Sequence, residues 1–193
     1  ARNVNVQITF YSTDQYTYAL LRGDYQQFIK CCNYYLNKIK KCGIAHIQTG
    51  EINPNSIETA LQEAELAYNL AKVGEIEALN AKNPYSVLLN LHKAKTLPTI
   101  QLLTPLLSQR NKSRLIETLE LLLDHGLSIT TVSNYLGVSR QTVYTLMKRI
   151  ETLVGLLSDV NTRFLLSLEL RIYRLQCAFE KITTTHAIQN QLQ

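Results

Sequence analysis

Residues 140–148 carry a short polar face. Arg140, Gln141, Tyr144, Thr145 and Lys148 are spaced so that one helix would present them on the same side. Arginine and lysine bind phosphates, glutamine can form two hydrogen bonds with adenine, and threonine can contact the methyl group of thymine. These residue types at this spacing predict contacts with double-stranded DNA.

Two helices are needed to hold this face in place. The sequence predicts helices over 129–136 and 140–154, and each follows a serine that can cap it, Ser128 and Ser139. Gly137 lies between them and permits the positive φ of a tight turn. The order of cap, helix, glycine turn, cap and helix is typical of a helix-turn-helix.

Apolar residues at helical spacing are expected to pack the two helices together. Ser133 is small enough for the second helix to cross closely, and Val138 is expected to fill the angle between the helices. The alternative is a helical hairpin inside an all-α core, with a polar face that only meets water. The expected buried stripe consists of Ile129, Val132 and Leu136 in the first helix and Val143, Leu146, Met147 and Ile150 in the second.

The segment 113–175 resembles the C-terminal helix-turn-helix of the PucR/CdaR type of bacterial transcriptional regulators. The lead-in of that family is matched from Leu119 to Ser128, and its second helix from Ser139 to Gly155. The resemblance implies a sequence-specific DNA-binding regulator. The residues expected to contact DNA are Ser139, Arg140, Gln141, Thr142, Tyr144, Thr145, Lys148 and Arg149.

Three positions depart from the family pattern. Gln141 stands where the family usually has Asn, and Tyr144 and Leu146 stand where it usually has Arg. The loss of the two arginine charges leaves open a second-ranked alternative function, a non-catalytic sensing or dimerisation module whose DNA binding is weakened or lost. Salt-dependent binding to duplex DNA separates the two hypotheses.

The first half of the chain alternates strand and helix patterns, which predicts an α+β module followed by the all-α helix-turn-helix domain. Asp24 is expected to cap the first helix, and Gly43 to end it. The predicted elements are strands over 4–10 and 16–21 forming a hairpin, a helix over 24–41, a strand over 44–50, a helix over 56–72 and a short edge strand over 76–79.

This half resembles a degenerate GGDEF-like domain over about residues 4–80. The helix "AELAYNLAKVGE" (64–75) is similar to a helix of that fold, and the hairpin turn falls at residues 12–16. The turn has no glycine, its one acid is Asp14, and Gln15 stands at the glutamate position. We therefore predict no catalytic residues, no metal, no cofactor and no enzyme activity. A nucleotide-processing enzyme ranks third among the functions considered.

Composition sets broad limits on the function. The 193 residues carry a net charge of +5, which permits nucleic-acid binding without arguing for it. No apolar run approaches the length of a membrane span. The four cysteines lack zinc-site spacing, so we expect reduced thiols and a cytoplasmic protein. Because the chain begins with Ala1, we expect a C-terminal fragment or a short family member.

The predicted organisation has four parts: 1–95, the α+β module; 96–111, a connector with Pro98 and Pro105 as helix breakers; 112–180, the helix-turn-helix domain; and 181–193, a flexible tail. The last helix is expected over 162–179, following Asn161. We expect a homodimer, with Leu175 and Phe179 as interface candidates. The sequence leaves room for a small-molecule effector without giving its identity.

Overall fold

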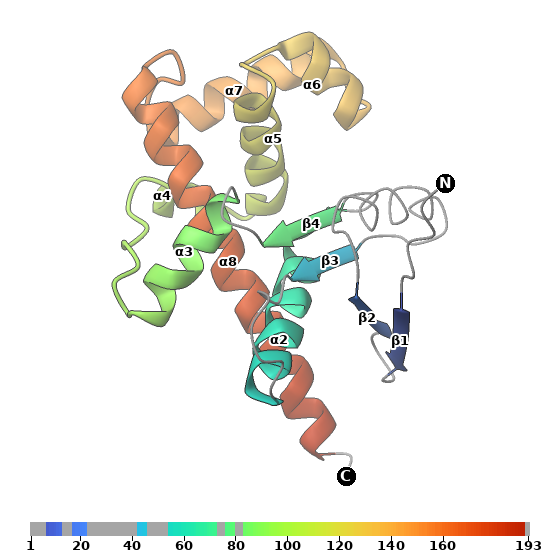
Figure 1. Ribbon diagram of the computed structural model, residues 1–193. Helices are drawn as coiled ribbons and strands as arrows, with labels where there is room; N and C mark the ends of the chain where they lie inside the picture. Colours follow the sequence, from blue (N-terminus) through green and yellow to red (C-terminus); the bar gives the residue numbers. More distant parts are fainter. Residues whose placement is uncertain are drawn as a thin grey trace. The chain divides into compact units, whose positions relative to one another are not determined.

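The computed structural model describes the backbone of residues 7–12, 17–22, 42–45, 54–72, 76–79 and 83–191 (Figure 1). The chain divides into two compact units. The first consists of residues 1–87 and 177–193, and the second of residues 88–176. The predicted connector at 96–111 therefore lies inside the second unit.

The first unit begins with the predicted hairpin. Strands β1 (Gln7–Ser12) and β2 (Thr17–Arg22) pair antiparallel, with Gln7 opposite Arg22 and Ser12 opposite Thr17. The turn residues 13–16, Asp14 among them, lie outside the described residues, as does the helix predicted over 24–41.

A strand–helix–strand motif follows the hairpin. β3 (Cys42–Ala45) and β4 (Ile76–Leu79) pair in parallel, and α2 (Pro54–Leu70) connects them, as parallel neighbours require. The first half is thus mixed α and β, as predicted. The residues buried here include Ile44, Leu66, Ala67, Leu70 and Leu79.

Gly43 does not end a helix, which corrects the sequence prediction. It lies inside β3, which begins two residues before the predicted start of that strand. A Cβ atom at Gly43 would overlap the backbone of Ala64 and Tyr68 in α2. The glycine is therefore required by the close approach of helix and strand. The remainder of the predicted strand, 46–50, lies outside the described residues.

The remaining elements are helical. They are α3 (Pro84–Lys93), α4 (Thr104–Leu107), α5 (Lys112–Asp124), α6 (Ile129–Leu136), α7 (Arg140–Val154) and α8 (Val160–Gln191). The predicted bounds of α6 and α7 are confirmed. Pro105 does not break a helix but lies in the first turn of α4, where a missing N–H costs no helical hydrogen bond.

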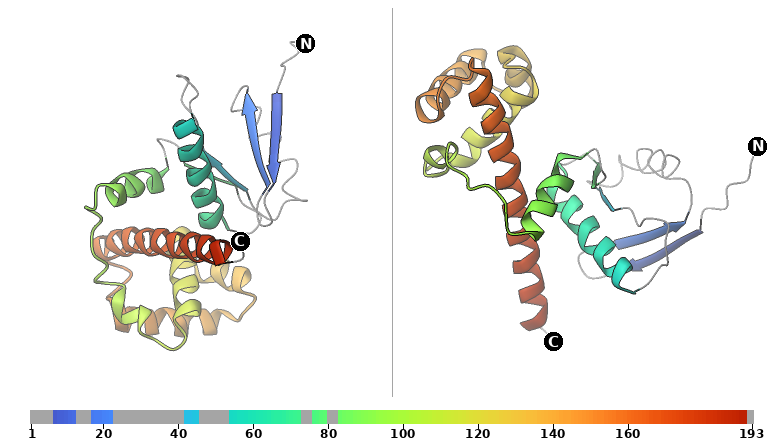
Figure 2. Two further views of the ribbon diagram at one scale, coloured as in Figure 1. Left: turned by 90° about the horizontal axis from the view of Figure 1, so that it is seen from below. Right: turned by 60° about the vertical axis from the view of Figure 1, so that its left-hand side comes forward.

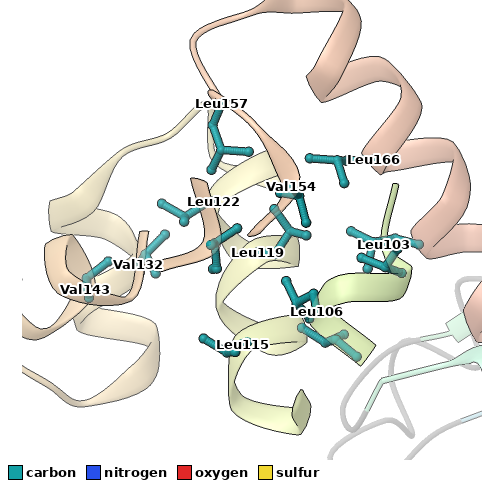
Figure 3. Packing of buried hydrophobic residues seen from close by; sticks show 13 residues of the cluster. Leu103, Leu106, Leu115, Leu119, Leu122, Val132, Val143, Val154, Leu157 and Leu166 are labelled. Carbon is teal, nitrogen blue, oxygen red and sulfur yellow. The ribbon is translucent and has the colours of Figure 1, made fainter. Parts of the chain in front are cut away.

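A leucine-rich core holds the second unit together (Figure 3). Leu103 and Leu106, from the segment predicted as a connector, are completely buried in this core. They pack with α5, α6, α7 and the first half of α8. The other members of the core are Leu115, Ile116, Leu119, Leu122, Val132, Val143, Ile150, Val154, Leu157, Leu166 and Leu170.

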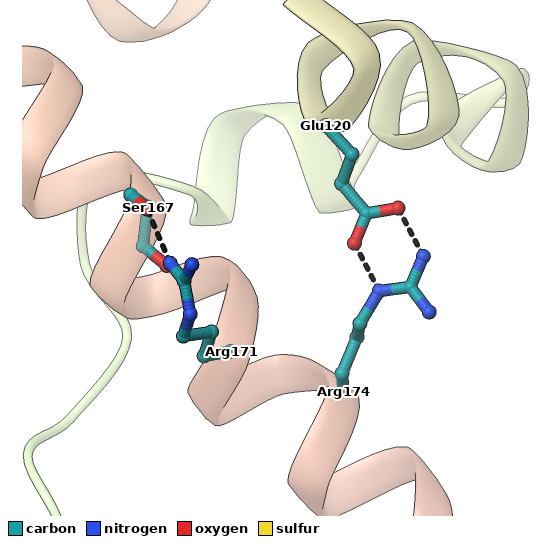
Figure 4. A network of polar contacts seen from close by, with 4 residues as sticks. All are labelled: Glu120, Ser167, Arg171 and Arg174. Atoms are coloured by element: carbon teal, nitrogen blue, oxygen red, sulfur yellow. Dashed lines mark hydrogen bonds and ion pairs between the residues drawn. The ribbon is translucent and has the colours of Figure 1, made fainter. Parts of the chain in front are cut away.

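Two carboxylates reinforce this packing through α8. Glu169 accepts hydrogen bonds from the backbone N–H groups of Gln101 and Leu102, at 3.1 Å each, and of Leu103 at 2.7 Å. Glu120 of α5 forms a two-bond ion pair with Arg174 (Figure 4). Both contacts satisfy polar groups beside the apolar core.

Helix α8 differs from its prediction at both ends. It begins at Val160, because Asp159 Oδ2 accepts the N–H of Thr162 at 2.7 Å and caps it, so the predicted start after Asn161 was wrong. It continues without a break to Gln191 (Figure 2), so most of the predicted tail at 181–193 is helical. After Gly155 the chain contains no glycine or proline that would end it.

The apolar side chains of α8 are also exposed at other positions than the predicted interface candidates. Leu175 is completely buried within the chain, so it is not available as an interface residue. Phe179 is half-buried, whereas Phe164 exposes 68% of its surface. In the part of the chain that the structure describes, no helix has the length and apolar character that a membrane span requires.

Candidate nucleic-acid interface

The turn between α6 and α7 has the geometry that the sequence predicted. Gly137 adopts a left-handed conformation with φ of 62°. The Ser139 Oγ caps α7 by accepting the N–H of Thr142 at 3.1 Å. The Ser128 Oγ caps α6 by accepting the N–H of Thr131 at 3.4 Å. The two caps satisfy helical N–H groups that would otherwise lack a partner.

The inner faces of α6 and α7 pack as expected. Val132, Val143 and Ile150 are completely buried. Ser133 is buried as well, and its hydroxyl donates to the carbonyl oxygen of Thr130 at 2.8 Å. Val138 is partly buried against the same core. The other predicted stripe residues, Ile129, Leu136, Leu146 and Met147, are also partly buried against it.

The outer face of α7 consists of the five polar residues from which the prediction began. Arg140, Gln141, Tyr144, Thr145 and Lys148 are all exposed. The Thr145 hydroxyl donates to the backbone carbonyl of Gln141 at 2.9 Å, so its oxygen remains an acceptor. Arg140 makes no hydrogen bond or ion pair with the described residues. Its guanidinium group is therefore available for an anionic partner.

Lys148 is held by a neighbour on its own helix. Its Nζ lies 2.9 Å from a Glu151 carboxylate oxygen and 5.6 Å from the centre of the Tyr144 ring. The hydrogen bond with Glu151 and the nearby charges raise the pKa of Lys148, which therefore stays protonated. The second Glu151 oxygen accepts the N–H of Leu157 at 3.2 Å. Binding of Lys148 to a phosphate would thus exchange one ion pair for another.

The remaining predicted residues lie at the border of this face. Ser139 is exposed, and Thr142 is half-buried with its Oγ1 2.9 Å from the Ser139 Oγ. Arg149 is exposed and donates to the Gln109 Oε1 at 3.2 Å. The structure therefore brings all eight predicted residues together on α7 and its cap. Their contact with DNA remains a prediction.

Sequence reasoning missed three cations next to this face. Arg110, Lys112 and Arg114 are exposed just before α5 and in its first turn. The contact between Gln109 and Arg149 places this segment beside α7. A signal was present in the sequence, because neither 96–116 nor 125–150 contains an aspartate or glutamate. Net charge over the whole chain concealed this local excess.

The described residues were compared with the ligand sets that bind metal ions in proteins. Within those residues, no group of three or more His, Cys, Asp or Glu side chains is placed to hold a metal ion.

Comparison with known proteins identifies the region that contains this face. Residues 115–172 match the PucR C-terminal helix-turn-helix domain family. The match runs from α5 through α6 and α7 to the middle of α8, which are the elements that build the core under the polar face. No curated protein and no solved structure matched the chain.

Proposed function

From the PucR-type helix-turn-helix domain at residues 115–172, we propose that the protein is a sequence-specific DNA-binding transcriptional regulator. The observation that carries this proposal is the outer face of α7. It is exposed and polar, it contains no acid from 140 to 150, and it is fixed by two serine caps and a left-handed glycine.

In the proposed complex, α7 enters the major groove, which is wide enough for an α-helix. Gln141 and Thr145, in the first two turns, are placed to read base edges. Arg140 binds a phosphate directly, and Lys148 does so after leaving Glu151. Tyr144 lies between Arg140 and Lys148 on α7, and its hydroxyl can donate a hydrogen bond to the phosphate backbone of the DNA.

The alternative, a module that has lost DNA binding, rested on the missing arginines at 144 and 146. Leu146 is partly buried against the core, so this position is not part of the outward face. Its change from arginine therefore removes less charge from the interface than the sequence implied. Arg140, Lys148 and Arg149 still supply three cations along α7.

We infer that the regulator binds as a homodimer, since helix-turn-helix proteins commonly read two half-sites related by two-fold symmetry. Exposed apolar residues close together in sequence support this: Leu156 lies just before α8, and Val160, Phe164 and Leu165 lie in its first two turns. Their exposed area is roughly 400 Å², in the range of functional patches on monomers. A standard interface needs about 800 Å² per partner, so polar neighbours would supply the remainder.

The first unit has a different proposed role. We infer that it is a degenerate GGDEF-like module without enzyme activity, which relays the binding of a small molecule or another signal to the DNA-binding unit. A regulator of this kind works in the cytoplasm, where its DNA is. Incubation with GTP and magnesium tests this role, and formation of a cyclic dinucleotide would contradict it.

The DNA-binding proposal is tested by selecting bound duplexes from a random library and measuring affinity at several salt concentrations. We expect a palindromic consensus and a steep decrease of affinity with salt. Arg140→Ala should weaken binding and lower the log–log salt slope by about one. Lys148→Ala should have a smaller effect, because Lys148 is already paired with Glu151. A wild-type protein that retains no duplex would contradict the proposal.

A further inference from the structure

A second cationic surface lies beside α7. It consists of Arg110, Lys112 and Arg114, and we refer to these three residues as the α5 flank. Each is exposed. None of them forms an ion pair with a described residue, and none belongs to the face from which DNA binding was predicted.

The position of the α5 flank is fixed by hydrogen bonds. The Gln109 side chain accepts from Arg149 of α7 at 3.2 Å through its Oε1 and donates to the carbonyl of Pro105 in α4 at 3.3 Å through its Nε2. The Gln109 side chain thus holds the start of the flank beside α7. Arg149 lies at the border of the α7 face, so the flank continues the cationic surface sideways from that border.

Nearby acids do not neutralise this surface. No aspartate or glutamate occurs from 96 to 116. On α5, the Glu120 carboxylate is taken up by Arg174, and on α7 the Glu151 carboxylate is taken up by Lys148 and the N–H of Leu157. The N-terminus of the 13-residue α5 adds its partial positive charge. The exposed Glu117 follows Arg114 by three residues but forms no ion pair with it in the described structure, so the three cations of the flank retain an excess of positive charge that attracts anions.

We propose that the α5 flank binds the DNA phosphate backbone beside the groove that α7 enters, and this inference rests on the proposed function. Because it lies to the side of α7, the flank is positioned for the sugar–phosphate chain and not for base edges. Arginine and lysine there neutralise phosphates without reading sequence. The flank would thus add affinity and fix the register of α7 while leaving specificity to Gln141 and Thr145.

The double variant Arg110→Ala/Lys112→Ala, made in the 193-residue chain, tests the proposal. We expect duplex affinity to decrease on the order of tenfold and the salt slope to fall by about two, because two phosphate contacts are lost. The selected consensus should stay the same. The charge-preserving pair Arg110→Lys/Lys112→Arg should keep both affinity and slope. Lys181→Ala, which removes an exposed cation outside this surface, is the matched control and should have little effect.

The outcomes separate this inference from the proposed function. If the double variant binds with wild-type affinity and slope while Arg140→Ala is weakened, the flank does not contact DNA and the function stands. If the variant changes the consensus, the flank reads bases and the backbone proposal is overturned. If the wild-type protein binds no duplex, both proposals fail together.

Discussion

Gln141 is the side chain best placed to carry sequence information. It lies in the first turn of α7 and is exposed, and its side-chain amide makes no hydrogen bond with the residues that the structure describes, whereas its backbone carbonyl accepts the Thr145 hydroxyl. A glutamine amide can form two hydrogen bonds with adenine in the major groove, whereas the neighbouring Arg140 can bind a phosphate of any nucleotide. Adjacent residues are thus expected to divide specificity and affinity between them.

This division leads to a prediction for Gln141→Ala. The variant should lose preference at one base pair of each half-site, by about 1–3 kcal/mol, while its non-specific affinity changes little. Selection from a random duplex library, done in parallel with the wild type and Arg140→Ala, measures both quantities. An unchanged consensus would show that Gln141 bonds only a phosphate.

At the residue scale, periodicity was sufficient to predict which side chains of α7 face outward. It did not reveal their partners. The pairing of Lys148 with Glu151 follows an i, i+3 spacing that is visible in the sequence, but the contact of Arg149 with Gln109 spans 40 residues. Such a contact depends on how the helices pack, which local pattern does not determine.

The turn between α6 and α7 gives a prediction at the scale of elements. Apart from the adjacent residues of the chain, no atom of the described structure lies within 4 Å of the position of a Cβ at Gly137, so Gly137→Ala adds backbone strain without a clash. Its positive φ should make alanine cost about 1–2 kcal/mol of unfolding free energy. Gly137→Asn should cost less, because asparagine tolerates this conformation. Denaturant unfolding measures both, and equal stability of all three proteins would contradict the account.

The cap of α8 predicts a pH dependence. Hydrogen bonds from the Thr162 hydroxyl and N–H lower the pKa of Asp159 below its ordinary value. The charged cap therefore stabilises the folded state above the unfolded pKa of about 4, and this contribution is lost as the pH falls through the folded pKa.

Asp159→Asn is the matched variant for this effect, because it keeps a capping oxygen and removes the charge. The advantage of the wild type over this variant should be present at neutral pH and should shrink as the pH drops below about 4. Urea unfolding of both proteins across this range measures it. A constant difference from neutral to acid pH would show that the charge contributes nothing.

Elements with strong local signals were predicted best. Serine caps and a glycine turn act within four residues, which is why α6 and α7 were located correctly. The roles of Gly43 and Pro105 were predicted wrongly. Glycine can end a helix or permit a close approach of helix and strand, and proline can break a helix or lie in its first turn; tertiary contacts decide between these roles. Asp159 was missed because the segment around it offers several residues that can cap a helix.

The exposed start of α8 gives a prediction for the whole molecule. Phe164→Ser should shift the protein from dimer to monomer, since it removes the largest exposed apolar side chain of the patch. Binding to a palindromic duplex should weaken more than binding to a single half-site. Val87→Ser, which also replaces an exposed apolar residue, serves as the control. Light scattering at tens of micromolar gives the oligomeric state, and a wild-type monomer on and off DNA would rule out the dimer.

At this scale the sequence was least informative. It assigned Leu103 and Leu106 to a connector, although both are completely buried in the core. It also gave Leu175 as an interface candidate, although Leu175 is buried and Phe164 is exposed. Helical spacing shows which face of a helix is apolar but not which part of that face the rest of the chain covers. Which part of a helix is buried depends on residues distant in sequence. Here the Glu169 carboxylate accepts the N–H groups of residues 101–103 and holds that segment, with Leu103, against α8.

The two segments without acids, 96–116 and 125–150, also bear on the speed of recognition. A surface of one sign attracts a polyanion before contact, over about 8 Å at physiological ionic strength, and can raise association rates by one to three orders of magnitude. Once captured at random positions, a protein held mainly by phosphates can slide along the duplex until its base-reading residues find their sequence. Lower salt should therefore shorten the search for the operator.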